Sequence, residues 1–195
     1  LIITIPLLGA LLAGSIRNVD VAKQIAFFTA LITFVLTACA ALLFDADKSG
    51  FQLVERYDWI PLLKIEYLVG VDGISVLFLP MTGLLTIITM LASWSAISHS
   101  SRFHFSLLLA LESVSIGVFC ALDTVLFFLF WELTLPPFFF LIGLWGIGSQ
   151  RRSAAMKYTL FMLAGGVTLL LAIIVLATNH AKQIGGQIPN DLTFS

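Results

Sequence analysis

Long apolar segments alternate with short polar ones along this chain. Because the hydrocarbon layer of a bilayer is about 30 Å thick, apolar runs of about 18 residues or more predict membrane-spanning helices. One shorter run precedes five runs of that length, and together they predict six spans, at residues 1–16, 24–44, 73–97, 103–122, 124–147 and 154–178. The runs lack the polar–apolar alternation of a membrane β-barrel. Helices, which satisfy their own backbone groups, therefore account for them best.

Residues 45–72 differ from the rest of the chain, because they hold six of its eleven acidic residues and three of its ten basic ones. Within them, FQLVERYDWI and KIEYLV lie on either side of Pro61, a pattern that predicts two short strands around a turn. We expect a small β-hairpin on the membrane surface, with an irregular loop as the alternative. The predicted fold class is thus an all-α integral membrane protein with about six spans and one surface hairpin.

These patterns divide the chain into four parts. Residues 1–44 are expected to form the first two membrane helices, 45–72 the hairpin linker, and 73–178 helices three to six. Residues 179–195 are expected to be a loop toward a further helix. The segment Leu1–Leu12 has neither a basic start nor a small-residue cleavage site, so we expect it to belong to a helix and not to a signal peptide.

The composition agrees with a membrane protein. Hydrophobic residues make up 59% of the chain and charged residues 11%, against about 25% charged in ordinary soluble domains. The net charge of −1 and the lack of a basic block argue against a nucleic-acid partner. Cys39 and Cys120 lie in apolar runs, where two thiols make neither a disulfide framework nor a zinc site. We expect no metal or cofactor site in this chain.

The basic residues predict which way the spans face. With six spans both termini lie on one side, together with the hairpin linker. The opposite side then carries six basic residues: Arg17, Lys23, Arg102, Arg151, Arg152 and Lys157. The terminal side carries four: Lys48, Arg56, Lys64 and Lys182. Since basic residues accumulate on the negative side of a membrane, the side with six is expected to face the cytoplasm or the mitochondrial matrix.

Two acidic residues interrupt the apolar spans. Glu112 lies 11 residues before the turn at Asp123 and Glu132 lies 9 residues after it. At 1.5 Å per residue both are roughly 13–16 Å from the turn, close to the bilayer midplane, on adjacent antiparallel helices. Carboxylates at that depth are expensive and usually functional. The low dielectric disfavours the charged form, so the pair suits a proton relay. The alternative is a structural hydrogen bond to another helix.

The sequence after Glu132 strengthens its candidacy. Pro136 has no N–H, and its ring collides with the carbonyl of Glu132 one turn earlier, so the helix is expected to kink there. Ion sites in transporters often lie at such irregularities. Lys157, one turn into the last span, is a candidate charge partner for Glu132, and the alternative is that it extends to the membrane surface.

Two further acidic residues lie at helix starts, where their role is expected to be structural. Asp72 is followed by Gly73 directly before the third span, and Asp123 precedes the fifth. Aspartate is among the preferred N-cap residues, because its side chain accepts hydrogen bonds from the first free backbone amides.

The stretch FLFWELTLPPFFFLIGLWG resembles a known family. Together with IGVFCALDTVLF before it, RRSAAMKYTLFMLAGG after it, and DWIP and VGVDGIS in the linker, it is similar to the M-type (subunit 4) antiporter-like membrane subunit of respiratory complex I. The resemblance implies the first part of a proton-antiporter-like fold, built from inverted repeats. It also implies that Glu132 relays protons, paired in the family with a lysine on a seventh helix. Glu112 matches a second relay glutamate found in some branches.

The same resemblance implies a function and a setting. It implies a membrane-arm subunit that couples NADH:quinone electron transfer to proton pumping and performs no redox chemistry itself. FMN, iron–sulfur clusters and quinone would lie in other subunits, and the partners would be neighbouring antiporter-like subunits and the lipid bilayer. The implied location is a bacterial or mitochondrial inner membrane, in preference to a thylakoid. The alternatives are a truncated or split scaffold subunit, or a subunit of a cation/proton antiporter, a membrane hydrogenase or a photosynthetic complex I-like enzyme.

Overall fold

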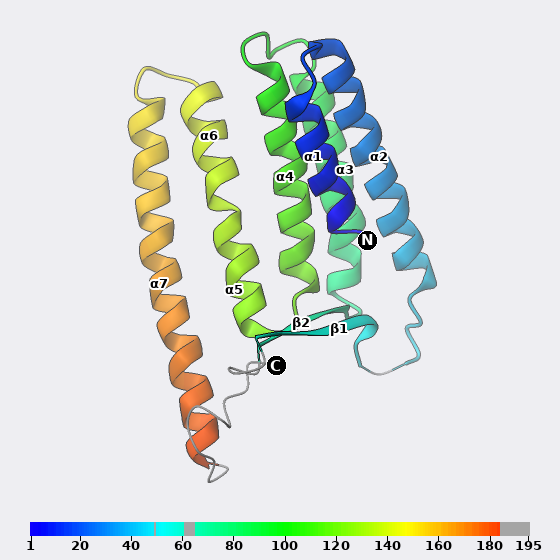
Figure 1. The fold of residues 1–195 in the computed structure, drawn as a ribbon, viewed down its shortest axis with the longest axis vertical. Helices are drawn as coiled ribbons and strands as arrows, with labels where there is room; N and C mark the ends of the chain where they lie inside the picture. Colours follow the sequence, from blue (N-terminus) through cyan, green and yellow to red (C-terminus); the bar gives the residue numbers. More distant parts are fainter. Residues whose placement is uncertain (49, 61–64, 184–195) are drawn as a thin grey trace.

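The computed structural model describes residues 1–48, 50–60 and 65–183. Seven helices and a two-stranded hairpin follow one another along the chain (Figure 1). Their bounds are α1 Thr4–Ser15, α2 Val19–Leu43, β1 Gln52–Ile60, β2 Ile65–Val71, α3 Ser75–Ser93, α4 Ser101–Cys120, α5 Thr124–Leu133, α6 Leu135–Trp145 and α7 Arg151–Gln183.

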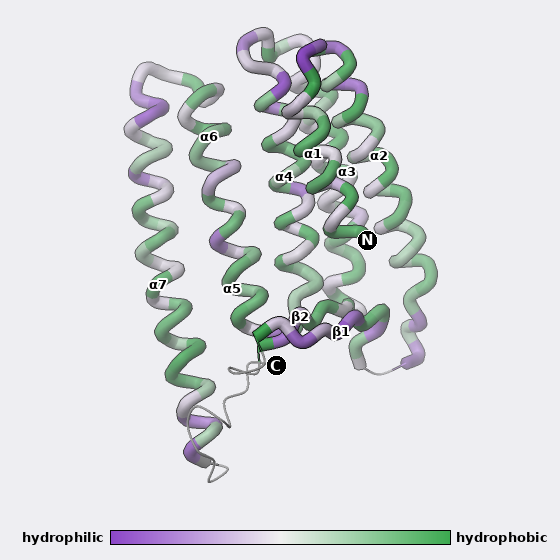
Figure 2. Tube along the Cα trace, in the orientation of Figure 1, coloured by the Kyte–Doolittle hydropathy of each residue, from purple (hydrophilic) through white to green (hydrophobic). Residues whose placement is uncertain are grey.

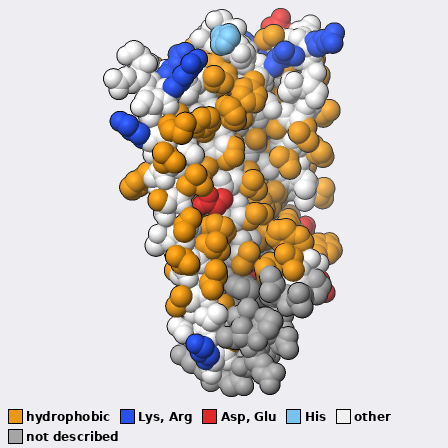
Figure 3. Space-filling view, turned by 60° about the vertical axis from the view of Figure 1, so that its left-hand side comes forward, with side chains coloured by type: hydrophobic (Ala, Val, Ile, Leu, Met, Phe, Trp, Pro, Cys, Tyr) orange, Lys and Arg blue, Asp and Glu red, His pale blue; other side chains and the backbone are white. Residues whose placement is uncertain are grey.

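The helices form a bundle with two different ends. One end, here called the basic end, holds the α1–α2, α3–α4 and α6–α7 connections, and the hairpin lies at the opposite, hairpin end (Figure 1). Hydrophobic residues dominate the length of the helices, and hydrophilic residues gather toward the ends (Figure 2). Lysine and arginine side chains cluster at the basic end, next to an apolar face (Figure 3). The gathering of basic side chains at one end of the bundle and the hairpin at the other end both agree with the arrangement that the sequence predicts.

Five helical segments of the described chain are long and apolar enough to cross a membrane: α2, α3, α4, α5 together with α6, and α7. The remaining helix, α1, has 12 residues and is therefore about 18 Å long, which is shorter than the hydrocarbon layer. The chain is thus an integral membrane protein with five long spans and one short apolar helix, as the hydrophobic pattern predicts.

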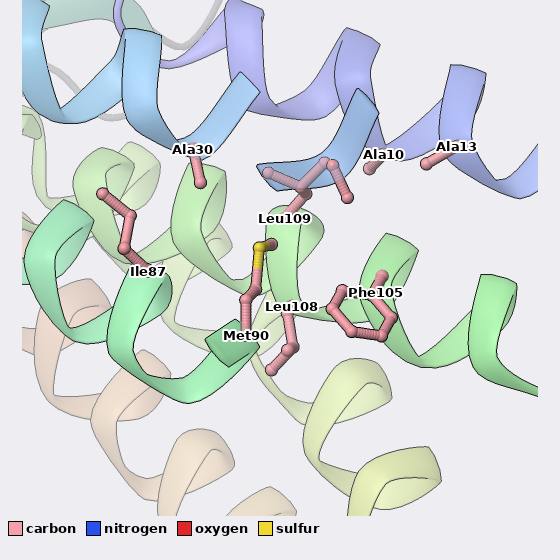
Figure 4. Close-up of a cluster of buried hydrophobic side chains, with 9 residues drawn as sticks. Ala10, Ala13, Ala30, Ile87, Met90, Phe105, Leu108 and Leu109 are labelled. Atoms are coloured by element: carbon pink, nitrogen blue, oxygen red, sulfur yellow. The ribbon is translucent and has the colours of Figure 1, made fainter. Parts of the chain in front are cut away.

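Helix α4 is the centre of the bundle. It contacts α1, α2, α3, α5 and α6, as well as strand β2. Small residues of α1 and α2, including Ala10, Ala13 and Ala30, pack against Phe105, Leu109 and their neighbours on α3 and α4 (Figure 4). Two α4 hydroxyls donate to backbone carbonyls of the first segment, Ser106 to Ala10 and Ser113 to Ile3, each at 2.6 Å. These contacts hold the short α1 against α4.

The hairpin is fixed to the turn between α4 and α5. Strands β1 and β2 pair antiparallel, with Tyr57 opposite Tyr67, and Arg56 donates to Glu66 at 2.6 Å. The amide of Leu122 donates to the carbonyl of Leu68 at 3.0 Å, which joins β2 to the turn. The predicted hairpin is therefore present, and its docking on α5 is a feature that the sequence does not reveal. Pro61 and Lys64, at its expected turn, lie outside the described residues.

Two helices are longer than the apolar runs predict. Helix α2 begins at Val19 and not at 24, because the side chain of Asn18 accepts from the amides of Asp20 and Val21 and caps it. Helix α7 runs from 151 to 183. Residues 179–183, expected as loop, are therefore helical, with His180 and Lys182 in the last turn, where cations stabilise a helix. The rest of that expected loop lies outside the described residues.

Asp72 caps the first turn of α3. Its carboxylate accepts from the amides of Ser75 at 2.6 Å and Ile74 at 3.2 Å, and the Ser75 hydroxyl accepts from the amide of Asp72. The hydrogen bonds from Ser75 lower the pKa of Asp72 below its ordinary 3.8. Gly73 lies in the turn between them.

We expect Asp72→Ala to destabilise the chain by about 1 kcal/mol, as loss of a helix cap does elsewhere. Because the pKa is lower in the folded state, this stabilisation is present above pH 3.8, the ordinary value, and is lost as the pH falls through the lower folded pKa. Thermal unfolding in detergent at several pH values measures both effects. Asp72→Asn, which keeps the cap, is the control, and equal melting temperatures for Asp72→Ala and the parent at neutral pH would contradict the assignment.

Candidate functional site

The fifth predicted span is broken near its middle. Helix α5 ends at Leu133 and α6 begins at Leu135, with Thr134 between them. The Thr134 amide donates to the carbonyl of Trp131 at 3.2 Å, and its hydroxyl donates to the same carbonyl at 2.7 Å. Pro136 and Pro137 follow and supply no N–H to the turn before them. The break therefore falls where the prolines predict it, at Thr134, two residues after Glu132.

Glu132 lies at this break, with its side chain directed at α7. A Cβ built on Gly166 of α7 would overlap Oε1 of Glu132, so the carboxylate rests directly on the α7 backbone. Oε1 is buried, and among the described residues it has no hydrogen-bond partner. The same side chain lines a pocket of about 380 Å³ between α6 and α7, together with Pro136, Phe139 and Thr159. An unpaired carboxylate beside an apolar pocket is a group that can exchange a proton.

Glu112 occupies the interior of α4. It is 1% exposed, and neither carboxylate oxygen has a partner among the described residues. The relative depth of the two glutamates follows from the α4–α5 packing, in which a Cβ on Gly117 would lie 2.5 Å from the ring of Phe130. Gly117 is six residues before Asp123 and Phe130 seven after it, so the antiparallel helices are in register there. Both glutamates consequently lie at similar depth, as the residue count suggests.

The structure does not bring Lys157 to Glu132. Lys157 is exposed on α7, and no ion pair joins it to an acid in the described residues. It precedes Gly166, the contact of Glu132, by nine residues, which is about 14 Å along the helix and beyond the reach of a lysine side chain. The structure thus leaves Lys157 exposed and apart from Glu132, and its extension to the membrane surface stays a prediction.

Asp123 is the N-cap of α5 and is fully buried in the turn between α4 and α5. Its carboxylate accepts from the amides of Val125 and Leu126, each at 2.9 Å. Burial raises the pKa of Asp123, and the amide of Leu126 opposes that rise. Asp123 therefore fixes the start of the helix that carries Glu132.

Two residues of the site escape sequence reasoning. The Gly165–Gly166 pair indicates close helix packing, but only the three-dimensional arrangement shows that Gly166 is the buried member and that it meets Glu132. The hydroxyl oxygen of Thr159 is buried, lines the pocket of Glu132 and has no partner among the described residues. In the part of the chain that the structure describes, no group of three His, Cys, Asp or Glu side chains could hold a metal ion.

Known proteins resemble both the segment that carries Glu132 and most of the rest of the chain. A family model described as NADH:quinone oxidoreductase/Mrp antiporter, TM, matches residues 121–184, which include Glu132 and Gly166. F(420)H(2) dehydrogenase subunit M of Methanosarcina mazei is 34% identical over 185 residues, which is 95% of this chain and 37% of that protein. NADH-quinone oxidoreductase subunit M of Rickettsia typhi is 38% identical over 157 residues, 80% of this chain and 31% of that protein. The chain belongs to this family of antiporter-like membrane subunits.

A solved structure supports the fold assignment. A chain of respiratory complex I from Thermus thermophilus superposes with a TM-score of 0.78 at 22% identity, covering 98% of this chain and 37% of that one. At that identity the likeness shows a shared fold. This chain spans about a third of the length of the curated relatives it matches.

The family assignment places the broken helix and Glu132 inside the matched segment, and leaves the hairpin outside it. The two relatives are named for different electron donors, F420H2 and NADH, and match this chain at similar identity.

Proposed function

We propose that this chain is part of a proton-translocating membrane-arm subunit of an NADH:quinone oxidoreductase, and that Glu132 is its proton relay. The observation that carries the proposal is the Glu132 carboxylate at the helix break before Pro136, in the middle of an apolar span. Its buried Oε1 has no hydrogen-bond partner among the described residues, and carboxylates inside such spans are usually functional. Glu112, buried at similar depth on the neighbouring helix and without a hydrogen-bond partner in the part of the chain that the structure describes, is the second candidate relay.

The chain's own residues supply proton handling and no electron transfer. Glu132 takes up a proton from one side of the membrane and releases it to the other, and the apolar surroundings keep water from short-circuiting the path. Electrons would pass through FMN, iron–sulfur clusters and quinone held by other subunits. The proposed partners are those subunits and neighbouring antiporter-like subunits, which would cover the apolar face of α7. The proposed location is a bacterial or mitochondrial inner membrane.

Purification of the assembly through an affinity tag on this chain tests the proposal. We expect NADH dehydrogenase subunits to co-purify, and reconstituted vesicles to acidify or alkalinise their lumen when NADH and quinone are added. Co-purification with subunits of a cation/proton antiporter alone, or a chain that purifies without partners, would replace the proposal by the antiporter or scaffold alternative. An F420H2-driven or ferredoxin-driven response would keep the proton role and change the donor.

The orientation is tested by cysteine labelling. Asp47 at the hairpin end and Ser153 at the basic end are both exposed, so each is replaced by cysteine in a Cys39→Ala background, since Cys120 is buried. Because the basic end is expected on the negative side, an impermeant maleimide should label Asp47→Cys from the periplasm or intermembrane space. It should label Ser153→Cys only from the cytoplasm or matrix. The reverse pattern would overturn the orientation.

A further inference from the structure

Gly166 is the point at which α7 touches the candidate relay. A Cβ at this position would overlap Oε1 of Glu132, and would lie 2.8 Å from its Cδ and 3.5 Å from Oε2. Gly165, its neighbour on the same helix, has no atom within 4 Å of the corresponding position. Gly166 is buried and Gly165 exposed. The lack of a side chain at 166, and only there, makes room for the carboxylate.

No hydrogen bond holds that carboxylate oxygen within the described residues, because Oε1 of Glu132 is buried without a partner. Its position is therefore set by packing, with the α7 backbone on one side. The same side chain also lines the pocket formed with Pro136, Phe139, Thr159 and others. A change in the α7 surface at this point should therefore move the Glu132 carboxylate.

We propose that Gly166 is a positioning residue that seats the Glu132 carboxylate against α7, and so determines where in the membrane the proton is held. This inference rests on the proposed relay function of Glu132. It assigns a role to a residue of α7 that carries no titratable group.

The smallest perturbation is a single methyl group. Gly166→Ala places a Cβ in the space of Oε1, so the carboxylate must turn away from position 166. Gly165→Ala adds the same methyl group one residue away, in open space. Alanine is the better helix former at both positions, so a loss seen only at 166 cannot come from helix propensity. Shortening the acid should make room again, which gives the double variant Glu132→Asp/Gly166→Ala.

The test uses the intact complex in membranes and two readouts. The first is the pH dependence of dicyclohexylcarbodiimide labelling, which reports the protonated carboxyl, with the Glu132 peptide and the Glu112 peptide resolved by mass spectrometry. The second is substrate-driven proton uptake. In Gly166→Ala we expect the pH of half-maximal Glu132 labelling to move by about 0.5 or more, and proton uptake to fall between about 3-fold and 100-fold. Gly165→Ala should match the parent in both, and Glu112 labelling should not change.

The double variant decides between positioning and general disruption. Glu132→Asp/Gly166→Ala should pump faster than Gly166→Ala, because one methylene less on the acid compensates for one methyl more on α7. Equal labelling curves and uptake in Gly166→Ala and Gly165→Ala would overturn the inference, as would a double variant no better than Gly166→Ala. If Gly166→Ala moves the labelling curve but Glu132→Gln pumps normally, the positioning stands and the relay function fails.

Discussion

Glu132→Gln in the assembled complex is expected to lower proton uptake about tenfold or more. Glutamine keeps the size and the hydrogen-bonding capacity of the side chain but removes the titrating group. The unpaired position of Oε1 makes the exchange structurally mild, since no hydrogen bond in the described residues is broken. Quinone reduction should fall in parallel if the two processes are tightly coupled. Uptake is measured with a pH-sensitive dye in sealed vesicles.

The controls separate chemistry from packing. Glu132→Asp still titrates and should retain more uptake than Glu132→Gln, although it is one methylene shorter. Glu112→Gln should have the smaller effect, less than about threefold, if Glu112 is a secondary relay. An assembled complex with Glu132→Gln that pumps at the parental rate would leave Glu132 as a packing contact and place the relay elsewhere.

The second large effect concerns the packing that sets the depth of the two glutamates. Gly117→Ala should destabilise the α4–α5 contact by about 1–3 kcal/mol, as overpacking does in other cores. The reason is that the added Cβ would lie 2.5 Å from ring carbons of Phe130, which is 9% exposed and has little freedom to move. The measurement is the fraction of chain that stays in the complex after brief heating, read on a native gel.

Two variants make this result interpretable. Gly143→Ala adds a methyl group to another membrane helix, where the new Cβ would be 3.5 Å from the Cβ of Ala155, an ordinary contact. It should leave the heated complex intact. Phe130→Leu, which removes the ring, should restore part of the stability lost in Gly117→Ala. If Gly117→Ala and Gly143→Ala retain the same fraction of complex, the close α4–α5 contact does not limit stability.

Local patterns account for most of the fold. Apolar run length locates the spans, strand-forming residues on both sides of Pro61 locate the hairpin, and the proline pair locates the break after Glu132. Each of these signals acts within one or two helical turns, so the sequence alone displays it. Asn18 is also a local signal, although the apolar run alone does not include it. Asparagine is a preferred N-cap residue, and with Asp20 in the first turn it indicates that α2 begins at Val19.

The site needs information that no single segment carries. Consecutive residues on a helix point about 100° apart, so whether Gly165 or Gly166 meets Glu132 depends on the rotation of α7 against α5. The docking of Leu122 on Leu68 likewise joins segments that are separated in the sequence by the whole of α3 and α4. Lys157 shows the limit most clearly: its place one turn into the last span makes it a candidate partner of Glu132, but along α7 it lies about 14 Å from Gly166, where Glu132 makes contact.

The attachment of the hairpin to the base of α5 has a mechanical consequence. The Leu122–Leu68 hydrogen bond and the Asp123 cap anchor the lower half of the broken span. Helix α6 follows that half after Thr134 and packs mostly against α7. A displacement of α6 relative to α5 would therefore bend the span at Thr134, two residues from Glu132. A displacement of α6 at the basic end would then change which residues the Glu132 carboxylate contacts.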